Sequence, residues 1–558
     1  MGRHKKPIVT IDCETDPFKK DRVPVPFLWG LYDGERFRHW DNAPDMLRYL
    51  MQMDVVVFAH NGGKFDYQFI LDHLEPWTEV TIINNRLAKF MIGKAEFRDS
   101  WNILPAKLAS FGNKKEIDIT KLEPDVRAKH MEEIIRYNRQ DCVGLYEAVM
   151  AFRETYGTGL TLAGSAMNYW AKHFNHDKPE TDRAFYEEIA PFYSGGRVQC
   201  FHKGPIKRAF DAVDINSAYP YAMTHNHPIS THADECFPKA SDKIIPQSLY
   251  TIAGISRGAL PWKGADGALT FPNDGEGREY HITGWELQAA LDTKRLGPWQ
   301  MVKRLDFLKE INFTDYVSHF YDLKARSEKG SKEYTFAKLF MNSLYGKFGA
   351  NPDAYRSYGV VPLKDKDGLE NSPGVYLGKN CGPWRWSGML GSHALMVGED
   401  PVRVKGGHAG NPVESQYYNV ATAASITGFV RAFLLRHIDR IEKAGGRVLY
   451  CDTDSLVFQD VAAGDVCDLG KKLGEWTHEG RFDHGAIAGK KLYAFHGLDG
   501  KWKTATKGVR IGPAEICRVA EGEEVTWESI VPSWDMHQKP KAGEARKPKF
   551  LKRRVRMT

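Results

Sequence analysis

The sequence predicts an α/β protein built from several domains. With 558 residues the chain is longer than a single domain usually is, and about three to five domains are expected. Hydrophobic residues make up 42% and aromatic residues 12% of the chain, which is enough for packed cores and excludes a disordered polymer. Strand-like alternation in residues 8–14 and helical spacing in residues 131–150 and 314–326 supply both kinds of element.

Charge and cysteine usage exclude several classes of protein. The net charge is +6, and residues 539–556 hold nine Lys or Arg against one Glu, which is typical of contact with a polyanion or of a solvated tail. The eight cysteines include no CxxC pair, so we expect reduced thiols and neither a disulfide framework nor a zinc site. No apolar run approaches membrane-spanning length and the basic N-terminus leads into no signal-peptide core, so we expect a soluble intracellular protein.

The N-terminal part carries a first group of carboxylates. Asp12 and Glu14 alternate with apolar residues, so a strand presents both on one face. Asp66 follows a second strand, residues 55–59, and precedes a helix-like stretch. Tyr137 and Asp141 share a face of the helix over 131–150. Four such carboxylates can bind two Mg²⁺ ions while Tyr137 orients a water, although each residue taken singly is more commonly a surface acid.

A second group of carboxylates lies between two apolar runs, 448–450 and 456–458. This pattern predicts a strand, a tight turn and a strand, with Asp452 and Asp454 on one face at the tip. A polar hairpin turn is the alternative for this stretch alone. Asp214 is delivered by another strand and supplies a third carboxylate. From their spacing alone, Asp452 and Asp454 can both reach one cation.

A helix over residues 334–345 places three functional groups on one face. Lys338, Asn342 and Tyr345 recur at positions i, i+4 and i+7, and Gly346 follows them. An ordinary amphipathic helix rarely combines a cation, an amide and an aromatic ring in this way. The pattern therefore indicates a binding face.

In this order the stretches resemble motifs of the family-B DNA polymerases. DCE, HNGGKFD and YNRQD resemble the three motifs of the 3′→5′ exonuclease domain, and DINSAYP, KLFMNSLYG and YCDTDS resemble polymerase motifs A, B and C. YSGG, ITGFVR and GKKLY resemble weaker DNA-binding motifs. The resemblance spans residues 7–507 and is closest to the protein-primed polymerases of linear phage genomes, of the tectivirus type. It implies an RNase H-like exonuclease domain and a right-hand polymerase (palm, fingers and thumb) with insertions around the fingers.

The resemblance also implies roles for individual residues. The implied metal ligands are Asp12, Glu14, Asp66 and Asp141 in the exonuclease and Asp214, Asp452 and Asp454 in the polymerase, and Tyr137 assists the exonuclease. The implied nucleotide-binding residues are Tyr219, which excludes a 2′-hydroxyl group, Lys338, which grips the triphosphate, Asn342 and Tyr345. The implied DNA-binding residues are His60, Asn61, Phe65, Tyr193, Gly195, Gly196, Thr427, Arg431, Lys491 and Tyr493. Ala218 and Val430 depart from the family pattern. Lys107 is a candidate for the catalytic-site lysine of the exonuclease domain, with a solvated lysine as the alternative, and Lys324, Arg326, Lys503 and Lys507 are further phosphate candidates.

The implied domains follow the motif order. They are the exonuclease (1–155), a linker with the YxGG motif (156–200), the first part of the palm (201–232), a terminal-protein and template insertion (233–313), the fingers (314–350), a second insertion for strand displacement and processivity (351–415), the second part of the palm (416–500), and the thumb with a basic tail (501–558). Residues 254–284 are expected to be rich in loops.

The resemblance implies two Mg²⁺ ions in each active site, with Mn²⁺ as the alternative ion. It implies template–primer DNA and deoxynucleoside triphosphates as substrates, a terminal protein as primer, strand displacement, and a single-stranded DNA-binding protein as a further candidate partner. We expect a monomer in the cytoplasm of a bacterial host. Two alternatives stay open: a conventional family-B polymerase primed by nucleic acid, and a nuclease or single-strand-binding factor with a decayed palm.

Overall fold

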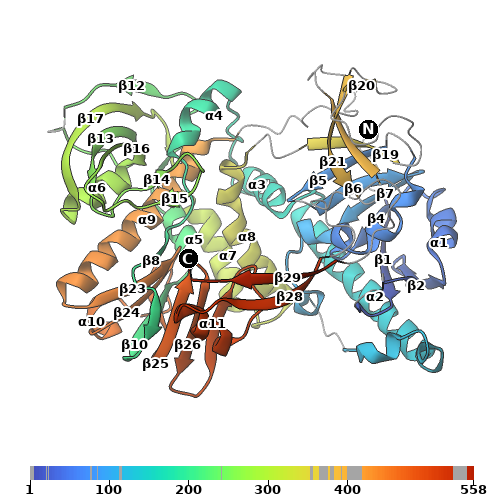
Figure 1. The fold of residues 1–558 in the computed structure, drawn as a ribbon. Coiled ribbons are helices and arrows are strands. Elements are labelled where there is room, and N and C mark those ends of the chain that lie inside the picture. The colour runs from blue at the N-terminus through green and yellow to red at the C-terminus, as the bar shows by residue number, and fades with distance from the viewer. Residues whose placement is uncertain are drawn as a thin grey trace.

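The computed structural model describes residues 6–19, 22, 24–75, 78–84, 86–111, 116–239, 242–351, 356–362, 375–377, 383–390, 393–398, 418–531 and 549–557. In Figure 1 the N-terminal sheet (blue) and a small sheet from residues 234–306 (green) lie on opposite sides of a central group of helices. The C-terminal strands (red) lie below that group.

The N-terminal part forms an 11-stranded sheet that a distant segment extends. In spatial order the strands are β20 (Val375–Leu377), β21 (Pro383–Leu390), β22 (His393–Gly398), β19 (Arg356–Pro362), β5 (Thr78–Ile83), β6 (Arg86–Ile92), β7 (Ala95–Asp99), β4 (Val56–Ala59), β1 (Ile8–Thr15), β2 (Pro26–Tyr32) and β3 (Phe37–Trp40). Strand β19 pairs antiparallel with β5, from Arg356 opposite Ile82 to Val360 opposite Thr78. The described strands of the expected second insertion therefore belong to the sheet of the first domain, and the rest of residues 351–415 lies outside the described part of the chain.

Helices α1 (Ala43–Leu50) and α2 (Met131–Tyr156) accompany this sheet, and the hydroxyl group of Thr10 donates a hydrogen bond to the Cys142 carbonyl group of α2 at 2.7 Å. The expected helix after Asp66 is wrong. The chain forms three short 3₁₀ turns there, η1 (Gly62–Lys64), η2 (Asp66–Phe69) and η3 (Leu71–His73). These turns hold Asp66 and Tyr67 against the sheet, because the Tyr67 hydroxyl group donates to the Arg98 carbonyl group at 2.6 Å. The remaining 3₁₀ turns are η4 (Ser100–Asn102), η5 (Leu108–Phe111), η6 (Ile119–Leu122), η7 (Arg127–His130) and η8 (Ala190–Phe192).

An eight-stranded sheet forms the centre of the rest of the chain. Its strands are β27 (Trp502–Thr506), β26 (Leu492–Gly497), β25 (Trp476–Gly489), β10 (Phe210–Ile215), β24 (Ser455–Gln459), β23 (Arg447–Asp452) and β8 (Val198–Cys200), with β9 (Gly204–Ile206) paired to β25. Helices α5 (Ala218–Met223) and α9 (Val420–Lys443) pack on each other beside this sheet. The predicted strand–turn–strand around Asp452 and Asp454 is confirmed as β23 and β24.

Two antiparallel helices lie between the two large sheets in Figure 1. The helix predicted over 314–326 is α7 (Thr314–Arg326), and the one predicted over 334–345 lies within α8 (Lys332–Phe348). Their inner face is aromatic, and the rings of Phe340 in α8 and Tyr156 in α2 stack with 3.9 Å between centroids. The other helices are α3 (Leu162–His173), α4 (Arg183–Ile189), α10 (Ala463–Val466) and α11 (Pro513–Ala520).

Residues 254–284, expected to be rich in loops, are so in their middle, because between residues 256 and 277 only two two-residue strands interrupt the turns. Regular strands border this stretch on both sides. Strands β12 (Asp234–Cys236), β17 (Leu296–Asp306), β13 (Leu249–Ser256) and β16 (Gly277–Thr283) form a four-stranded sheet covered by α6 (Gly284–Asp292). Helix α6 begins with a capping box between Thr283 and Glu286, which satisfies backbone N–H groups at its start. The glycines of this segment lie mostly in the turns between strands. The remaining strands are β11 (His227–Pro228), β18 (Glu310–Ile311), β14 (Trp262–Lys263), β15 (Leu269–Thr270), β28 (Val525–Val531) and β29 (Lys549–Val555).

Within the described residues, no helix combines the length and the apolar character that crossing a bilayer requires.

Two candidate carboxylate centres

The strand register brings the three candidate carboxylates of the polymerase group, Asp214, Asp452 and Asp454, together. Asp214 in β10 lies opposite Ser455, and Asp452 in β23 lies opposite the same residue from the other side of β24. Between Asp452 and Asp454 the chain turns through Thr453, whose φ is 62°. The backbone N–H of Thr453 donates to the Arg197 carbonyl group at 2.7 Å, which fixes this turn. Asp214, Asp452 and Asp454 therefore share one end of the sheet.

Mutual repulsion marks these carboxylates as a site for cations. Burial, with the negative charges of Asp454 and Glu479, raises the pKa of Asp214 to about 7. Burial, with the charge of Asp452, raises the pKa of Asp454 to about 6. Carboxylate oxygens are the ligands that Mg²⁺ prefers, and a divalent ion would relieve the crowded negative charge. The donor set fits the implied metal.

Lys491, for which the family resemblance implied a contact with DNA, contacts this centre directly. Lys491 Nζ lies 2.5 Å from Asp452 Oδ1, and the Lys491 backbone N–H donates to the Tyr450 hydroxyl group at 2.9 Å. That hydroxyl group donates to Asp452 Oδ2 at 3.3 Å. Tyr493 lies edge-on to Tyr450, with 5.4 Å between ring centroids. The Lys491–Asp452 ion pair was not predicted, because the two residues are far apart in sequence.

The predicted binding face of α8 points away from its core. Lys338 and Asn342 are exposed, whereas Phe340 and Leu344 of the same helix are buried. Burial and the neighbouring carboxylates raise the pKa of Asp214, and the positive charges of Lys503 and then Lys338 oppose this rise, so both lysines lie within electrostatic reach of the centre. At the end of this face, the ring of Tyr345 stacks on Tyr219. The side chains of motifs A and B thus meet beside the carboxylates.

The YSGG segment is tied to the same turn. A Cβ atom on Gly196 would lie 2.7 Å from the Thr453 side chain, so only glycine fits there without a shift. The ring of Tyr193 approaches Gly349 at the end of α8 in the same way. Gly195 is exposed, and its carbonyl group accepts a hydrogen bond from Arg431 at 2.7 Å. The segment therefore links the Thr453 turn, the end of α8 and α9.

Two residues expected to touch the template are buried instead. Arg431 is 3% exposed, and its Nε lies 2.7 Å from Glu286 Oε1 of α6. Its guanidinium group also donates to the carbonyl groups of Ser194 and Gly195. Thr427 is buried, and its hydroxyl group donates to the Ala424 carbonyl group at 3.2 Å. In this structure both side chains are used within the protein and neither is presented to a ligand.

The second centre gathers the exonuclease candidates around β1. The Asp66 side chain accepts a hydrogen bond from the Cys13 backbone N–H at 3.0 Å, which places it beside Asp12 and Glu14. Burial raises the pKa of the Cys142 thiol, and the negative charges of Asp12, Asp141, Glu14 and Asp66 raise it further. All four carboxylates therefore lie within electrostatic reach of one buried atom. Burial also raises the pKa of Asp66 to about 7.

Asn138 is a site residue that the sequence did not single out. Its amide group donates to Asp12 Oδ2 at 2.9 Å and to Glu14 Oε1 at 3.3 Å. Gly30, which lies opposite Asp12 in β2, leaves the room for it, because a Cβ atom there would lie 1.8 Å from Asn138 Oδ1. Its position between Tyr137 and Asp141 on α2 was the available signal. Tyr137 itself is half-buried on the same helix.

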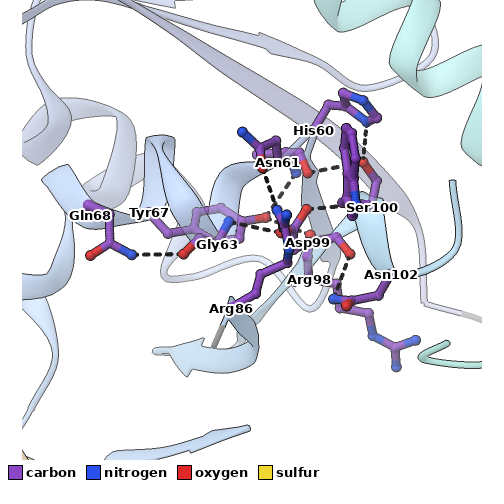
Figure 2. A network of polar contacts seen from close by, with 12 residues as sticks. His60, Asn61, Gly63, Tyr67, Gln68, Arg86, Arg98, Asp99, Ser100 and Asn102 are labelled. Atoms are coloured by element: carbon purple, nitrogen blue, oxygen red, sulfur yellow. Dashed lines mark hydrogen bonds and ion pairs between the residues drawn. The ribbon is translucent and has the colours of Figure 1, made fainter. Parts of the chain in front are cut away.

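A polar network holds the loop that carries His60 and Asn61 (Figure 2). Arg86 donates to Asn61 Oδ1 and forms an ion pair with the buried Asp99 at 2.9 Å. The Asp99 oxygen that faces Arg86, Oδ2, also accepts a hydrogen bond from the Gly63 backbone N–H at 3.1 Å. The other oxygen, Oδ1, accepts one from the Trp101 backbone N–H at 2.9 Å. Asn61 has a left-handed φ of 63°. The network therefore fixes the backbone and the side chain of this loop.

The other candidates of the first domain lie around this loop. His60 contacts Ser100 Oγ at 2.9 Å and the Ala106 carbonyl group at 3.0 Å through its two ring nitrogens. Phe65 lies 6.2 Å from Phe18, measured between ring centroids. Lys107 is exposed.

Comparison with known proteins gives concordant matches. A family model described as DNA polymerase type B, organellar and viral, matches residues 113–372. The DNA-directed DNA polymerase of Enterobacteria phage PRD1 is 36% identical over 524 residues, which cover 91% of this chain and 86% of that protein. The DNA polymerase of Bacillus phage phi29 is 24% identical, with 88% and 87% covered. A solved structure of phi29 DNA polymerase, complexed with primer-template DNA and incoming nucleotide substrates, matches with a TM-score of 0.73. The match covers 99% of this chain and 100% of that chain at 18% identity, so it shows a likeness of fold.

Proposed function

Because the chain belongs to the protein-primed family-B DNA polymerases of phages, we propose that it copies DNA at the Asp214 centre and proofreads at the Asp12 centre. DNA-directed DNA synthesis is the activity that the family carries. The observation that carries the finer assignment is the meeting of Asp214 and Asp452 across Ser455, beside the Lys338 face of α8.

In synthesis, the 3′ oxygen of the primer attacks the α-phosphorus of a deoxynucleoside triphosphate, and the bond to pyrophosphate breaks. Lys338 binds the triphosphate as a positive charge, and Asn342 and Tyr345 border the nascent base pair. Tyr219 lies beneath the sugar. Lys491 and Tyr493 hold the primer end, with Lys491 exchanging Asp452 for a primer phosphate.

Asp214, Asp452 and Asp454 would hold two Mg²⁺ ions, or Mn²⁺ in their place, and Asp12, Glu14, Asp66 and Asp141 a second pair. When bound, such ions lower the pKa of the attacking hydroxyl group or water and stabilise the charge on the leaving oxygen. Burial, together with the negative charges of Asp454 and Glu479, raises the pKa of Asp214 to about 7, which supports this assignment.

In proofreading, a water attacks the last phosphodiester, and the 3′ oxygen of the shortened strand leaves. Tyr137 orients the water, and Asn138 keeps Asp12 and Glu14 together. Asn61, His60 and Phe65 hold the single-stranded end, and Phe65 offers a ring for base stacking. Arg86 and Asp99 position Asn61 for this contact.

For Arg431 and Thr427, the two buried residues that were expected to bind the template, we propose a structural role instead. Arg431, through Glu286 and the Ser194 and Gly195 carbonyl groups, fixes the YSGG segment against α6. Tyr193, Gly195 and Gly196 are then the part of this region that meets DNA. Thr427 supports Arg431 from within α9.

The first test is primer extension with Mg²⁺ by the wild type and by Asp454→Asn. We expect the variant to lose synthesis by about three orders of magnitude or more and to keep 3′ end degradation, since one ligand of the polymerase ions is gone. Asp12→Ala with Asp66→Ala is the mirror control, which should lose degradation and keep synthesis. Undiminished synthesis by Asp454→Asn would remove the polymerase assignment.

Initiation on a terminal protein extends this proposal. The support is the likeness to the phage relatives and the sheet of residues 234–306, which stands beside the palm (Figure 1). The test is to incubate the enzyme with a candidate terminal protein and with dATP or dGTP, and to look for a covalent protein–nucleotide adduct. Extension of a DNA primer without any adduct would favour a polymerase primed by nucleic acid. We place the enzyme, as a monomer that displaces the non-template strand, in the cytoplasm of the host cell.

A further inference from the structure

Three metal-ligating side chains gather on the central sheet away from both carboxylate centres. Asp483 and His484 lie in β25, and His496 lies in the neighbouring strand β26. Asp214 is paired with Thr477 of β25, and Asp483 follows six residues later. At the rise of an extended strand this separation is roughly 20 Å, so the cluster is distinct from the polymerase centre.

A β-bulge builds the cluster. Phe482 lies opposite Gly497 and His484 opposite His496, so Asp483 is an extra residue in β25. Neighbouring side chains of a regular strand point to opposite faces, and a bulge redirects one of them. As a result, one carboxylate oxygen of Asp483 lies 2.7 Å from His484 Nδ1 and 2.9 Å from His496 Nδ1.

Trp502 closes one side of the cluster. Trp502 in β27 pairs with His496 in β26, which in turn pairs with His484 in β25, so the three side chains lie side by side across the strands. Its ring lies edge-on to His496 and His484, at 5.0 and 5.4 Å between centroids. The two imidazole rings lie 4.5 Å apart at an angle of 30°. The other side is open, because the side chains of His484 and Asp483 are 51% and 45% exposed.

We propose that Asp483, His484 and His496 form a binding site for a divalent transition-metal ion of the Zn²⁺ class. One ligand atom from each residue lies within 4.8 Å of the others, so small side-chain rotations bring all three onto one ion. Two imidazole nitrogens and a carboxylate suit Zn²⁺, with water in the open fourth position, whereas Mg²⁺ prefers oxygen ligands alone. The ion joins β25 to β26, and the site does not depend on the proposed function.

The competing description is a hydrogen-bonded His–Asp–His group without an ion. The two differ in metal stoichiometry. The full-length protein, dialysed against excess Mg²⁺ to fill the carboxylate centres, is titrated with Zn²⁺, and bound zinc is counted by elemental analysis. The same preparations are titrated with Co²⁺, whose visible absorption reports nitrogen ligation.

The variants are His496→Ala and Asp483→Asn. The matched control is His232→Ala, which removes another exposed histidine, 3.9 Å from Asp234, outside the cluster. We expect the wild type and His232→Ala to bind one tight equivalent of Zn²⁺ that His496→Ala lacks. In His496→Ala and Asp483→Asn the affinity for Zn²⁺ should fall by more than roughly 10- to 100-fold, which is the loss when only a group that hydrogen-bonds to a metal ligand is removed.

A thermal melt separates loss of the site from loss of the fold. Without Zn²⁺, His496→Ala should melt close to the wild type. Added Zn²⁺ should raise the Tm of the wild type and of His232→Ala but not that of His496→Ala, since binding to the folded state alone stabilises it. Equal zinc stoichiometry and affinity in the wild type and in the folded His496→Ala and Asp483→Asn variants would overturn the proposal.

Discussion

The rings of Tyr219 and Tyr345 stack on each other, with 4.3 Å between centroids and 18° between planes. One ring comes from α5, which follows the Asp214 strand, and the other from α8, which carries Lys338. The stack therefore joins α5 to α8 at the place proposed for the sugar of the incoming nucleotide.

Replacing Tyr219 tests its proposed contact with the sugar. Tyr219→Val removes the ring, so we expect discrimination against ribonucleoside triphosphates to fall by about 10- to 200-fold, the range for a steric pocket contact. Tyr219→Phe keeps the ring and should keep the discrimination. The measurement is the ratio of kcat/KM for a deoxynucleotide and its ribonucleotide. A wild-type ratio in Tyr219→Val would show that another group excludes the 2′-hydroxyl.

A methyl group at Gly30 should impair proofreading alone. The added Cβ atom would displace the Asn138 side chain, which lies 1.8 Å away, from Asp12 and Glu14. We expect Gly30→Ala to reduce 3′ end degradation by about tenfold or more, the scale for loss of a group that orients metal ligands. Gly144→Ala is the matched control, because a Cβ atom there meets nothing within 4 Å and alanine favours the helix. Equal degradation by both variants would contradict a role for Asn138.

A methyl group at Gly196 should impair synthesis alone. It would press on Thr453 and shift the turn between Asp452 and Asp454. We expect Gly196→Ala to lose about tenfold or more in synthesis, the order that a small misplacement of catalytic groups produces, with degradation unchanged. Adding Thr453→Gly removes the clash and suits the φ of 62°, so the double variant should recover activity. Absence of recovery would indicate that Gly196 acts by another route.

Arg86 should affect how the exonuclease binds its substrate. Arg86→Ala with Asp99→Asn removes the ion pair without leaving a buried charge, and it frees the Asn61 side chain. We expect the KM for single-stranded DNA to rise about tenfold with a smaller change in kcat, because the proposed role of Asn61 is to hold the substrate and not to take part in the chemistry. The result that contradicts this is a fall in kcat with KM unchanged.

The metal-free protein should lose stability as the pH rises. The pKa values of Asp66 and Asp214 are raised from 3.8 to about 7, and that of Asp454 to about 6. Between pH 4 and 7 the folded state thus binds more protons than the unfolded state, so the free energy of unfolding falls across this window.

Thermal melts in EDTA at pH 5 and pH 8 measure this loss. Asp214→Asn should gain on the order of 1 kcal/mol at pH 8, after allowance for solvent screening, and Mg²⁺ should restore the wild type but help the variant less. A melt that does not depend on pH, or a variant that is less stable than the wild type at pH 8 in EDTA, would contradict the crowding of these carboxylates.

The sequence predicted the elements whose pattern is local. The Asp12 strand, the helix over 314–326 and the Asp452–Asp454 turn were all expected, because alternation, helical spacing and turn residues are read within a few positions. The helix expected after Asp66 was wrong, since tertiary contacts of Tyr67 hold the chain in short turns. The loops within residues 254–284 were expected, but the four-stranded sheet formed by the strands around them was not predicted.

Contacts between distant residues could not be predicted. Nothing near Lys491 indicates that its ammonium group meets Asp452, and nothing near Arg431 indicates that Glu286 lies against it. Such pairs depend on how separate elements pack. The residue types at the two centres were predicted, and their supporting residues were not.

The pairing of β19 with β5 means that the N-terminal part of the chain is not a separable module. A fragment ending near residue 155 would expose the unpaired backbone of β5 along its edge, and such edges promote self-association. Cutting the chain between the two centres would therefore yield a protein prone to aggregate, and coexpressing residues 356–398 as a separate strand-forming peptide should improve its solubility. Natural exchange of this N-terminal part between related proteins would require moving two stretches of gene together.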